Sequence, residues 1–546
     1  MGRMEKEVKN KRFEEKYSPE ENFMGGVSYK LDPVDTLKMV TASSIFGEPQ
    51  YYRNGEFVKR TISDGIYVPH RVIKDFAILG DHHEGKRTSE VMEEVIDNAL
   101  DYDFRKTIDW AVKLRKEFYM RLNPQIIMVR AAMHPIRIEF NKENGSYFRK
   151  TNVEVMSRAD EPAKQLTYFL YRYGSKQGLP SVLKRSWKDR LESMARYEAA
   201  KYKNVGIGMI DVIRICHANS PLIDELMQTG TVEFKENNST WENLRSKGAS
   251  WKEIVESINI PHMASLRNLR NIFEEIEDRE LAKKFIVKLK DTVPYAKQFP
   301  FRYYTALKAI KKSEANHKPI ITNGLEECMD IALDNMPDFS GKVACLTDNS
   351  GSAWKSFVSE FATTKIAEIN NLSSVLTAMK SDEGYVYKFG DGLVEYPITK
   401  RNGALAQANE ITSGGSKEVG GATEHGIWLF FKKAINEEIH WDTIFIYSDQ
   451  QAGHGGLYGK SGAVDNEYTI DNKYNDYVDV MKLIQKYRSK VNPKVNVFTI
   501  QTAGYDNVLI PEQFYRGTAL YGWTGKEILY AQRYIDLWNK LETKNQ

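Results

Sequence analysis

The feature that most constrains the fold is a change of hydrophobic pattern near residue 335. Before this point, over residues 31–312, apolar residues recur three and four positions apart, as in the stretch 104–118, and strand-like alternation is scarce. This spacing predicts amphipathic helices. Beyond it, short apolar runs alternate with longer helical stretches. The chain is therefore predicted to fold as an all-helical module followed by an α/β module.

Three apolar runs in the second module have the length and composition of buried parallel strands. They are residues 342–347 (KVACLT), 442–447 (DTIFIY) and 494–500 (KVNVFTI). Helices are predicted at residues 356–380, 423–437, 474–490 and 525–540. Strands separated by helices indicate crossover connections within one sheet. Ligands of such sheets bind beyond the carboxyl ends of the strands, so the functional residues are expected there.

Length and composition agree with two large folded domains preceded by a tail. A chain of 546 residues is too long for a single core, and its 41% hydrophobic and 28% charged residues are ordinary for globular protein. Residues 1–22 are dominated by charged side chains and are expected to form a flexible tail. The net charge of +3 identifies no partner, because nucleic-acid binding depends on local clusters of charge.

The cysteines and the absence of long apolar stretches indicate the cellular compartment in which the protein is expected. Cys216, Cys328 and Cys345 are odd in number and far apart, so neither a disulfide framework nor a CxxC zinc site is expected. The sequence contains no stretch of about 18 to 20 apolar residues, and it begins with charged residues rather than a signal peptide. A cytoplasmic location is expected.

A candidate metal site follows the first predicted strand. In the sequence DNSGS, residues 348–352, the alternate positions Asp348, Ser350 and Ser352 can turn their oxygens toward one point. Thr423 opens a later predicted helix, and Asp449 lies at the end of the strand at 443–448. Carboxylates and hydroxyls are ligands that Mg²⁺ accepts. We therefore expect Mg²⁺, or another divalent cation such as Mn²⁺, at these five residues.

Other interpretations of the same loop agree less well with its sequence. Ser350 or Ser352 could simply cap a helix. The turn lacks both the GxGxxG of dinucleotide-binding folds and the GxxxxGK[ST] of nucleoside triphosphatases. A phosphotransferase of the DxDxT type is disfavoured because Ser350 replaces its second aspartate. No activated nucleophile is apparent, so no catalytic residue is predicted.

Two windows of the helical half are strongly basic and aromatic. Residues 164–203 hold ten Lys or Arg against three Asp or Glu, and residues 282–312 hold nine against one. Cations that neutralise phosphates, combined with planes on which bases stack, suit single-stranded RNA. The alternative is a solvated helix face in front of core aromatics, and a core role is expected for Trp187 and Phe301.

Several fragments, in order along the chain, carry a resemblance to known families. They are NFMGG at 22–26, NPQ at 123–125, GLPSVLKR at 178–185, DVIRICH at 211–217 and FPFRYYTAL at 299–307. This series resembles the TROVE module of the Ro ribonucleoprotein family, and the metal-site residues resemble the metal-ion-dependent adhesion site (MIDAS) of von Willebrand A domains. Pro33, residues 46–50 and Pro180 depart from the family's glycine-rich stretches.

The resemblance implies a fold and a function. The expected fold is a ring of HEAT-like helical repeats over residues 23–330, closed by a doubly wound, Rossmann-like von Willebrand A domain over residues 335–546. It implies a monomeric, non-enzymatic chaperone for RNA quality control, which binds small noncoding Y-like RNAs and the single-stranded ends of misfolded RNAs. Lys184, Arg185 and His217 match the family's RNA-contacting positions.

The family also implies how the metal site is used, and two further functions remain open. The ion would accept a carboxylate from a partner protein, such as an exoribonuclease. A metal-dependent enzyme acting on RNA, with Asp348 and Asp449 holding the ion, is one alternative. A pure protein-adhesion module without RNA affinity is the other.

Overall fold

The computed structural model describes most of the chain in segments. They are residues 19–21, 27–29, 32–42, 88–173, 178–202, 208–230, 232, 241–355, 364–421, 424–449, 469–470, 477–478, 480–502, 509–510, 515–522 and 525–543. The predicted tail at 1–22 lies almost wholly outside these residues, as do the fragment NFMGG and the position Thr423.

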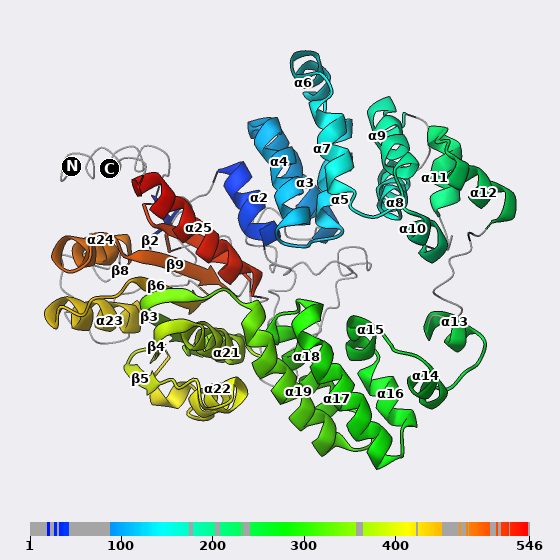
Figure 1. Ribbon diagram of the computed structural model, residues 1–546. Helices are drawn as coiled ribbons and strands as arrows, with labels where there is room; N and C mark the ends of the chain where they lie inside the picture. Colours follow the sequence, from blue (N-terminus) through cyan, green and yellow to red (C-terminus); the bar gives the residue numbers. More distant parts are fainter. Residues whose placement is uncertain are drawn as a thin grey trace, which may run out of the picture. The chain divides into compact units, whose positions relative to one another are not determined.

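The described residues between 32 and 240 form one compact, helical unit. Its helices are α2 (Pro33–Ala42), α3 (Thr88–Tyr102), α4 (Phe104–Lys116), α5 (Asn123–Met133), α6 (Arg137–Asn144), α7 (Tyr147–Val155), α8 (Glu161–Tyr173), α9 (Ser181–Glu192), α10 (Arg196–Lys201), α11 (Met209–Cys216) and α12 (Pro221–Thr229). Figure 1 shows them as a series of short helices.

Local sequence signals explain where these helices begin and end. The Asp103 carboxylate caps α4 by accepting the Lys106 N–H at 2.9 Å, and Ser220 caps α12 in the same way. Gly230 ends α12 with a left-handed φ of 74°, a conformation that costs glycine little. The predicted apolar spacing of residues 104–118 is confirmed, because α4 buries one face that includes Phe104, Ile108, Ala111 and Leu114.

A second compact unit contains the described residues from Trp241 onward. Its helical part comprises α13 (Trp241–Ser246), α14 (Trp251–Ser257), α15 (His262–Arg267), α16 (Leu269–Glu275), α17 (Arg279–Ala296), α18 (Pro300–Lys311), α19 (Lys318–Ala332) and the 3₁₀ turn η4 (Leu333–Asn335). Side chains of α14 to α19 share one apolar cluster with a face of the following sheet. The predicted division at 330–335 remains a prediction.

The sheet has six strands in the order β10-β9-β6-β3-β4-β5. The strands are β3 (Phe339–Asp348), β4 (Ser381–Phe389), β5 (Leu393–Pro397), β6 (Thr443–Ser448), β9 (Asn496–Gln501) and β10 (Gly517–Tyr521). All neighbouring pairs are parallel except β4 and β5. The three predicted strands are confirmed as β3, β6 and β9. Two further sheets have two antiparallel strands each. One pairs β1 (Pro19–Glu21) with β2 (Val27–Tyr29), and the other pairs β7 (Thr469–Ile470) with β8 (Tyr477–Val478).

Helices cover both faces of this sheet. The helical elements are α20 (Gly351–Lys355), α21 (Ile366–Met379), α22 (Ala404–Ser413), η5 (Ser416–Glu418), α23 (Glu424–Asn436), α24 (Val480–Lys490) and α25 (Lys526–Thr543). Val343 and Cys345 of β3 pack in one core with α21 and α25, whereas Ala344 and Leu346 pack in another with α23 and α24. Alternate side chains of a strand point to opposite faces, so the sheet is doubly wound, as predicted.

Two further findings concern the cysteines and membrane spans. All three cysteines are buried free thiols. In the part of the chain that the structure describes, no helix has the length and apolar composition needed to cross a bilayer.

Candidate metal centre and nucleic-acid interface

The two predicted carboxylate ligands lie at the same edge of the sheet. Asp348 is the last residue of β3, and Asp449 directly follows β6. Because the two strands are parallel neighbours, with Thr347 opposite Tyr447, their carboxyl ends meet. Both aspartates have no exposed surface. The structure thus brings together two buried carboxylates that are 101 positions apart in the sequence.

The two serines lie on the loop that follows β3. The Asp348 Oδ1 accepts the backbone N–H of Ser350 at 2.8 Å, which folds the loop back over the strand end. The hydroxyls of Ser350 and Ser352 are 3.2 Å apart, at the start of α20. On the other side, the Ser448 hydroxyl donates to Asp348 Oδ2 at 2.6 Å. The predicted cluster of Asp348, Ser350, Ser352 and Asp449 is therefore compact.

Burial and like charge disfavour the ionised form of Asp348. Loss of solvent, followed by the charge of Asp449, raises the pKa of Asp348 to about 7, although hydrogen bonds from Ser448 and Ser350 oppose this shift. Two carboxylates that share a buried site cannot both ionise cheaply unless a cation lies between them. The pair is therefore electrostatically suited to a positive ion.

The fifth predicted ligand, Thr423, lies outside the described residues, but the loop that leads to it is described. The backbone N–H of Gly351 donates to the Gly421 carbonyl at 3.0 Å. The Gly421 N–H in turn donates to Asp391 Oδ2 at 2.8 Å. Gly420 has a left-handed φ of 84°, which explains why glycine is required at this position of the loop. The glycine-rich loop therefore runs against the serine-bearing loop.

The donor set fits a hard divalent cation better than a soft one. Among the described residues, no group of three or more His, Cys, Asp or Glu could hold a metal. Any ion at this edge would therefore depend on Asp348, Asp449 and the serine hydroxyls. Such oxygen donors, with remaining positions left to water, match the preference of Mg²⁺ or Mn²⁺. Two-metal nucleases gather more carboxylates than these two.

A layer of polar residues behind the site was not predicted. The Asn370 Nδ2 donates to the Asp348 carbonyl at 3.2 Å, and its Oδ1 accepts the Thr502 hydroxyl at 2.7 Å. Asn349 and Asn371 exchange side-chain hydrogen bonds of 2.7 and 3.2 Å. All of these residues are buried. The available signal was the pair of adjacent asparagines in the otherwise apolar stretch IAEINNL, residues 366–372.

The predicted RNA-contacting cations lie near the start of α9. Gly178, with a φ of 81°, and the N-capping Pro180 precede the helix. Arg185 is exposed and Lys184 is half-buried, whereas Val182, Leu183 and Trp187 point into the core. Within the described part of the chain, the Arg185 guanidinium is hydrogen-bonded to Ser181 alone, with Nη2 3.3 Å from the hydroxyl. Neither Lys184 nor Arg185 forms an ion pair with a described residue.

His217 lies near the C-terminal end of α9, the helix that begins with the two cations. It follows α11 in a left-handed conformation with a φ of 53°, and its side chain is exposed. The neighbouring Asn219 N–H donates to Glu192 Oε1 at 2.9 Å. Glu192 ends α9, eight residues or about 12 Å beyond Lys184. His217 is thus a solvent-facing residue rather than a buried structural histidine, and it is separated from the two cations.

The aromatic residues of the two basic windows divide into core and surface. Trp187 and Phe301 are 0% and 3% exposed, which confirms the core role expected for them. Tyr197 is 47% exposed and Tyr295 is 84% exposed. The buried Arg190 is also structural, because its guanidinium binds the Met156 carbonyl and Glu198. Only part of each window is therefore available to a ligand.

Trp187 offers a test of this division. Its Nε1–H donates to Gln165 Oε1 at 2.7 Å inside the helical unit. We expect Trp187→Phe to lower the free energy of unfolding by about 1–3 kcal/mol, because a buried hydrogen bond and some core volume are lost. RNA affinity should not change in protein that remains folded. Denaturant titration and filter binding measure the two effects. The exposed Tyr197→Phe is the control, with an expected stability change within about 0.5 kcal/mol.

Comparison with known proteins adds a family match and a structural match. Residues 226–388 match the model of the TROVE domain. The crystal structure of the Deinococcus radiodurans Ro (RSR) protein is similar, with a TM-score of 0.55 and 12% sequence identity. That match covers 80% of this chain and 93% of the other. At this identity the structural match shows a shared fold. A search of curated proteins found no match.

The described architecture agrees with the structural match. A mostly helical N-terminal region followed by a mixed six-stranded sheet domain is consistent with helical repeats and a von Willebrand A-like domain. The TROVE match runs from α12 to β4, so it includes the serine-bearing loop at 348–352.

Proposed function

We propose that this chain is a non-enzymatic RNA chaperone of the Ro type. It binds small noncoding Y-like RNA and the single-stranded ends of misfolded RNAs, and it acts as a monomer in RNA quality control in the cytoplasm. The observation that carries the proposal is the basic start of α9 in a chain with a TROVE match, where neither Lys184 nor Arg185 forms an ion pair with a described residue. Lysine and arginine side chains at a protein surface neutralise phosphates of a bound nucleic acid.

The position of these cations also favours RNA over a generic surface role. The two residues occupy the first turns of α9, where the helix dipole adds positive potential. The acidic residues of the same helix come later and are already engaged, Asp189 with Arg149 and Glu192 with Lys188. One end of the helix therefore presents net positive charge to an anionic ligand.

We also propose that the sheet edge holds Mg²⁺ or Mn²⁺ through Asp348, Ser350, Ser352, Thr423 and Asp449. When bound, the ion would offer a coordination position to a carboxylate of a partner protein, such as an exoribonuclease. The buried pair of carboxylates beside two hydroxyls supports this assignment. In this proposal, the five residues would bind the ion and fix its position.

Incubation with RNA and Mg²⁺ tests the chaperone against the enzyme. We expect a gel-shift assay with 5′-labelled single-stranded RNA to show bound RNA that remains full length after prolonged incubation. If the natural chain shortens the RNA and the Asp348→Ala variant leaves it full length, the protein is a metal-dependent nuclease. Full-length RNA without any shift would favour the adhesion module.

A further inference from the structure

The second basic window, residues 282–312, is not part of the RNA site proposed on α9, and its first half belongs to the helix α17. One face of this helix is buried in the core of the second unit, through Ala282, Phe285, Ile286, Leu289 and Val293. The opposite face is exposed and carries Lys284, Lys288, Asp291 and Tyr295. Spacings of four, three and four residues place these side chains in one stripe, about 16 Å long.

Tyr295 contributes little to the fold. Its side chain is 84% exposed, the highest value among the exposed large hydrophobic residues that the structure describes. No hydrogen bond or ring contact joins it to a described residue. An aromatic ring in water gives the fold none of the stabilisation that burial would provide. A ring presented in this way is suited to stacking on an unpaired base.

Two lysines precede Tyr295 on the same stripe. Lys284 and Lys288 are exposed, they lie about one helical turn apart, and neither forms an ion pair with a described residue. The lysines on the flank of the helix are engaged in ion pairs, Lys283 with Glu280 and Lys290 with Glu327. The cations of the stripe are thus those that point to solvent beside the exposed ring.

Nearby acidic groups leave this side of the helix with a surplus of positive charge. Asp278 caps the N-terminus of α17, where its carboxylate accepts two backbone N–H groups at 2.7 and 2.8 Å. Asp291 lies on the stripe itself, and the exposed Lys297 follows directly after the helix. Together with Lys284 and Lys288, three lysines therefore stand against one aspartate on and next to the stripe.

The end of α17 that carries Tyr295 is held firmly in the fold. His262 of α15 lies between two hydroxyls, with Nδ1 2.8 Å from Thr292 Oγ1 and Nε2 2.8 Å from the Tyr303 hydroxyl. Thr292 precedes Tyr295 by three residues, and Tyr303 is a buried residue of α18. These contacts join three helices at the end of α17. A ring on such a fixed element loses little mobility when a ligand binds, which favours affinity.

We propose that the outer face of α17 is a second RNA contact of this chain, where a base stacks on Tyr295 and phosphates pair with Lys284 and Lys288. The proposal rests on the proposed RNA-binding function. Charge complementarity favours an anionic occupant. The exposed ring favours a single-stranded segment over a duplex, because the bases of a duplex are already stacked and paired.

Filter binding of full-length variants to an RNA with a single-stranded 3′ tail tests the stacking contact. We expect Tyr295→Ala to weaken binding by about 5- to 100-fold, as is typical for the loss of one base–aromatic stack, without changing the salt slope. Tyr295→Phe keeps the ring and should bind as the natural chain does. Tyr102→Ala is the matched control, because Tyr102 is 56% exposed and ends α3, outside both basic windows.

The lysines provide a second, independent readout. Lys284→Gln combined with Lys288→Gln should lower the slope of log affinity against log salt by about 1.4, because each phosphate contact to a single strand contributes about 0.7. Lys113→Gln combined with Lys116→Gln removes the same charge from the exposed side of α4 and should leave the slope unchanged. All of these side chains are exposed, so the variants should fold as the natural chain does.

The same assay distinguishes failure of the α17 contact from failure of the proposed function. With the tail paired to a complementary strand, Tyr295→Ala should bind as the natural chain does, because no base is free to stack. Equal tail affinity of the natural chain, Tyr295→Ala and the Lys284–Lys288 variant would overturn the α17 contact alone, and an acidic protein segment would then be the better occupant. Absence of RNA binding by the natural chain would overturn the proposed function, and the α17 contact with it.

Discussion

Reversal of both charges at the start of α9 should weaken RNA binding by about 10- to 100-fold at low salt and flatten its salt dependence. Each cation that neutralises a phosphate of single-stranded RNA contributes about 0.7 to the slope of log affinity against log salt. Lys184→Glu combined with Arg185→Glu removes two such contacts and adds repulsion. Neither residue forms an ion pair with a described residue, so the reversal breaks no ion pair of the described structure.

The matched control reverses two exposed lysines elsewhere in the same helical unit. Lys113 and Lys116 lie on α4, outside both basic windows. Lys113→Glu combined with Lys116→Glu changes the net charge equally and should leave the salt slope close to that of the natural chain. Filter binding across a salt series measures both pairs. Equal losses in the two variants would mean that net charge, rather than the α9 surface, governs binding.

Removal of divalent cations should make the stability of the protein depend strongly on pH. The carboxyl of Asp348 titrates near 4 in an unfolded chain and at about 7 in the folded one. Between these values the folded chain holds a proton that the unfolded chain has lost. Stability should therefore fall as pH rises from about 4 to about 7, by at most about 1.4 kcal/mol per pH unit, and stay low above 7.

Added Mg²⁺ should cancel this loss, because a bound cation favours the ionised form of both Asp348 and Asp449. Denaturant titrations at pH 5 and pH 8, with Mg²⁺ or with a chelator, measure the effect. Stabilisation by Mg²⁺ is expected to be larger at pH 8. Asp348→Asn carries no charge at either pH, so it should lose both the pH dependence and the response to Mg²⁺. An Asn variant that still responds to Mg²⁺ would contradict the assignment.

The sequence predicted those elements whose evidence is local. The strands β3, β6 and β9 are short, continuous apolar runs, and such runs are typical of parallel strands buried on both faces. Strand β4 was missed because it begins Ser381-Asp382-Glu383-Gly384, which does not resemble a buried strand. Strands β5 and β10 have five residues each, too few for a clear pattern. These strands are stabilised by the neighbouring strands of the sheet, which the local sequence does not reveal.

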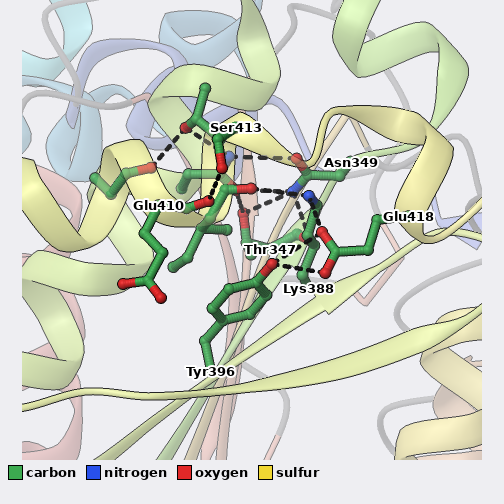
Figure 2. Close-up of polar contacts among 11 residues, drawn as sticks. Thr347, Asn349, Lys388, Tyr396, Glu410, Ser413 and Glu418 are labelled. Carbon is green, nitrogen blue, oxygen red and sulfur yellow. Dashed lines mark hydrogen bonds and ion pairs between the residues drawn. The ribbon is translucent and has the colours of Figure 1, made fainter.

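The candidate site was predictable only in part, for a related reason. Asp348, Ser350 and Ser352 form one local motif, and Asp449 could be added because parallel strands end at one edge. The ion pair of the buried Lys388 in β4 with Glu418 of the glycine-rich loop could not be found in this way. A lysine in a strand ordinarily marks a solvent-facing position, and its partner Glu418 comes 30 residues later (Figure 2). Tertiary pairing of this kind leaves no signature in local sequence.

The most direct test of the central claim compares two forms of one structured RNA. Filter binding would be measured across a salt series with a single-stranded 3′ tail on the RNA, and again with that tail paired to a complementary strand. We predict higher affinity for the unpaired tail and a decline as salt rises, because stacking requires free bases and the cations contact phosphates. Equal affinity for both forms, or no binding to either, would contradict the proposed chaperone function.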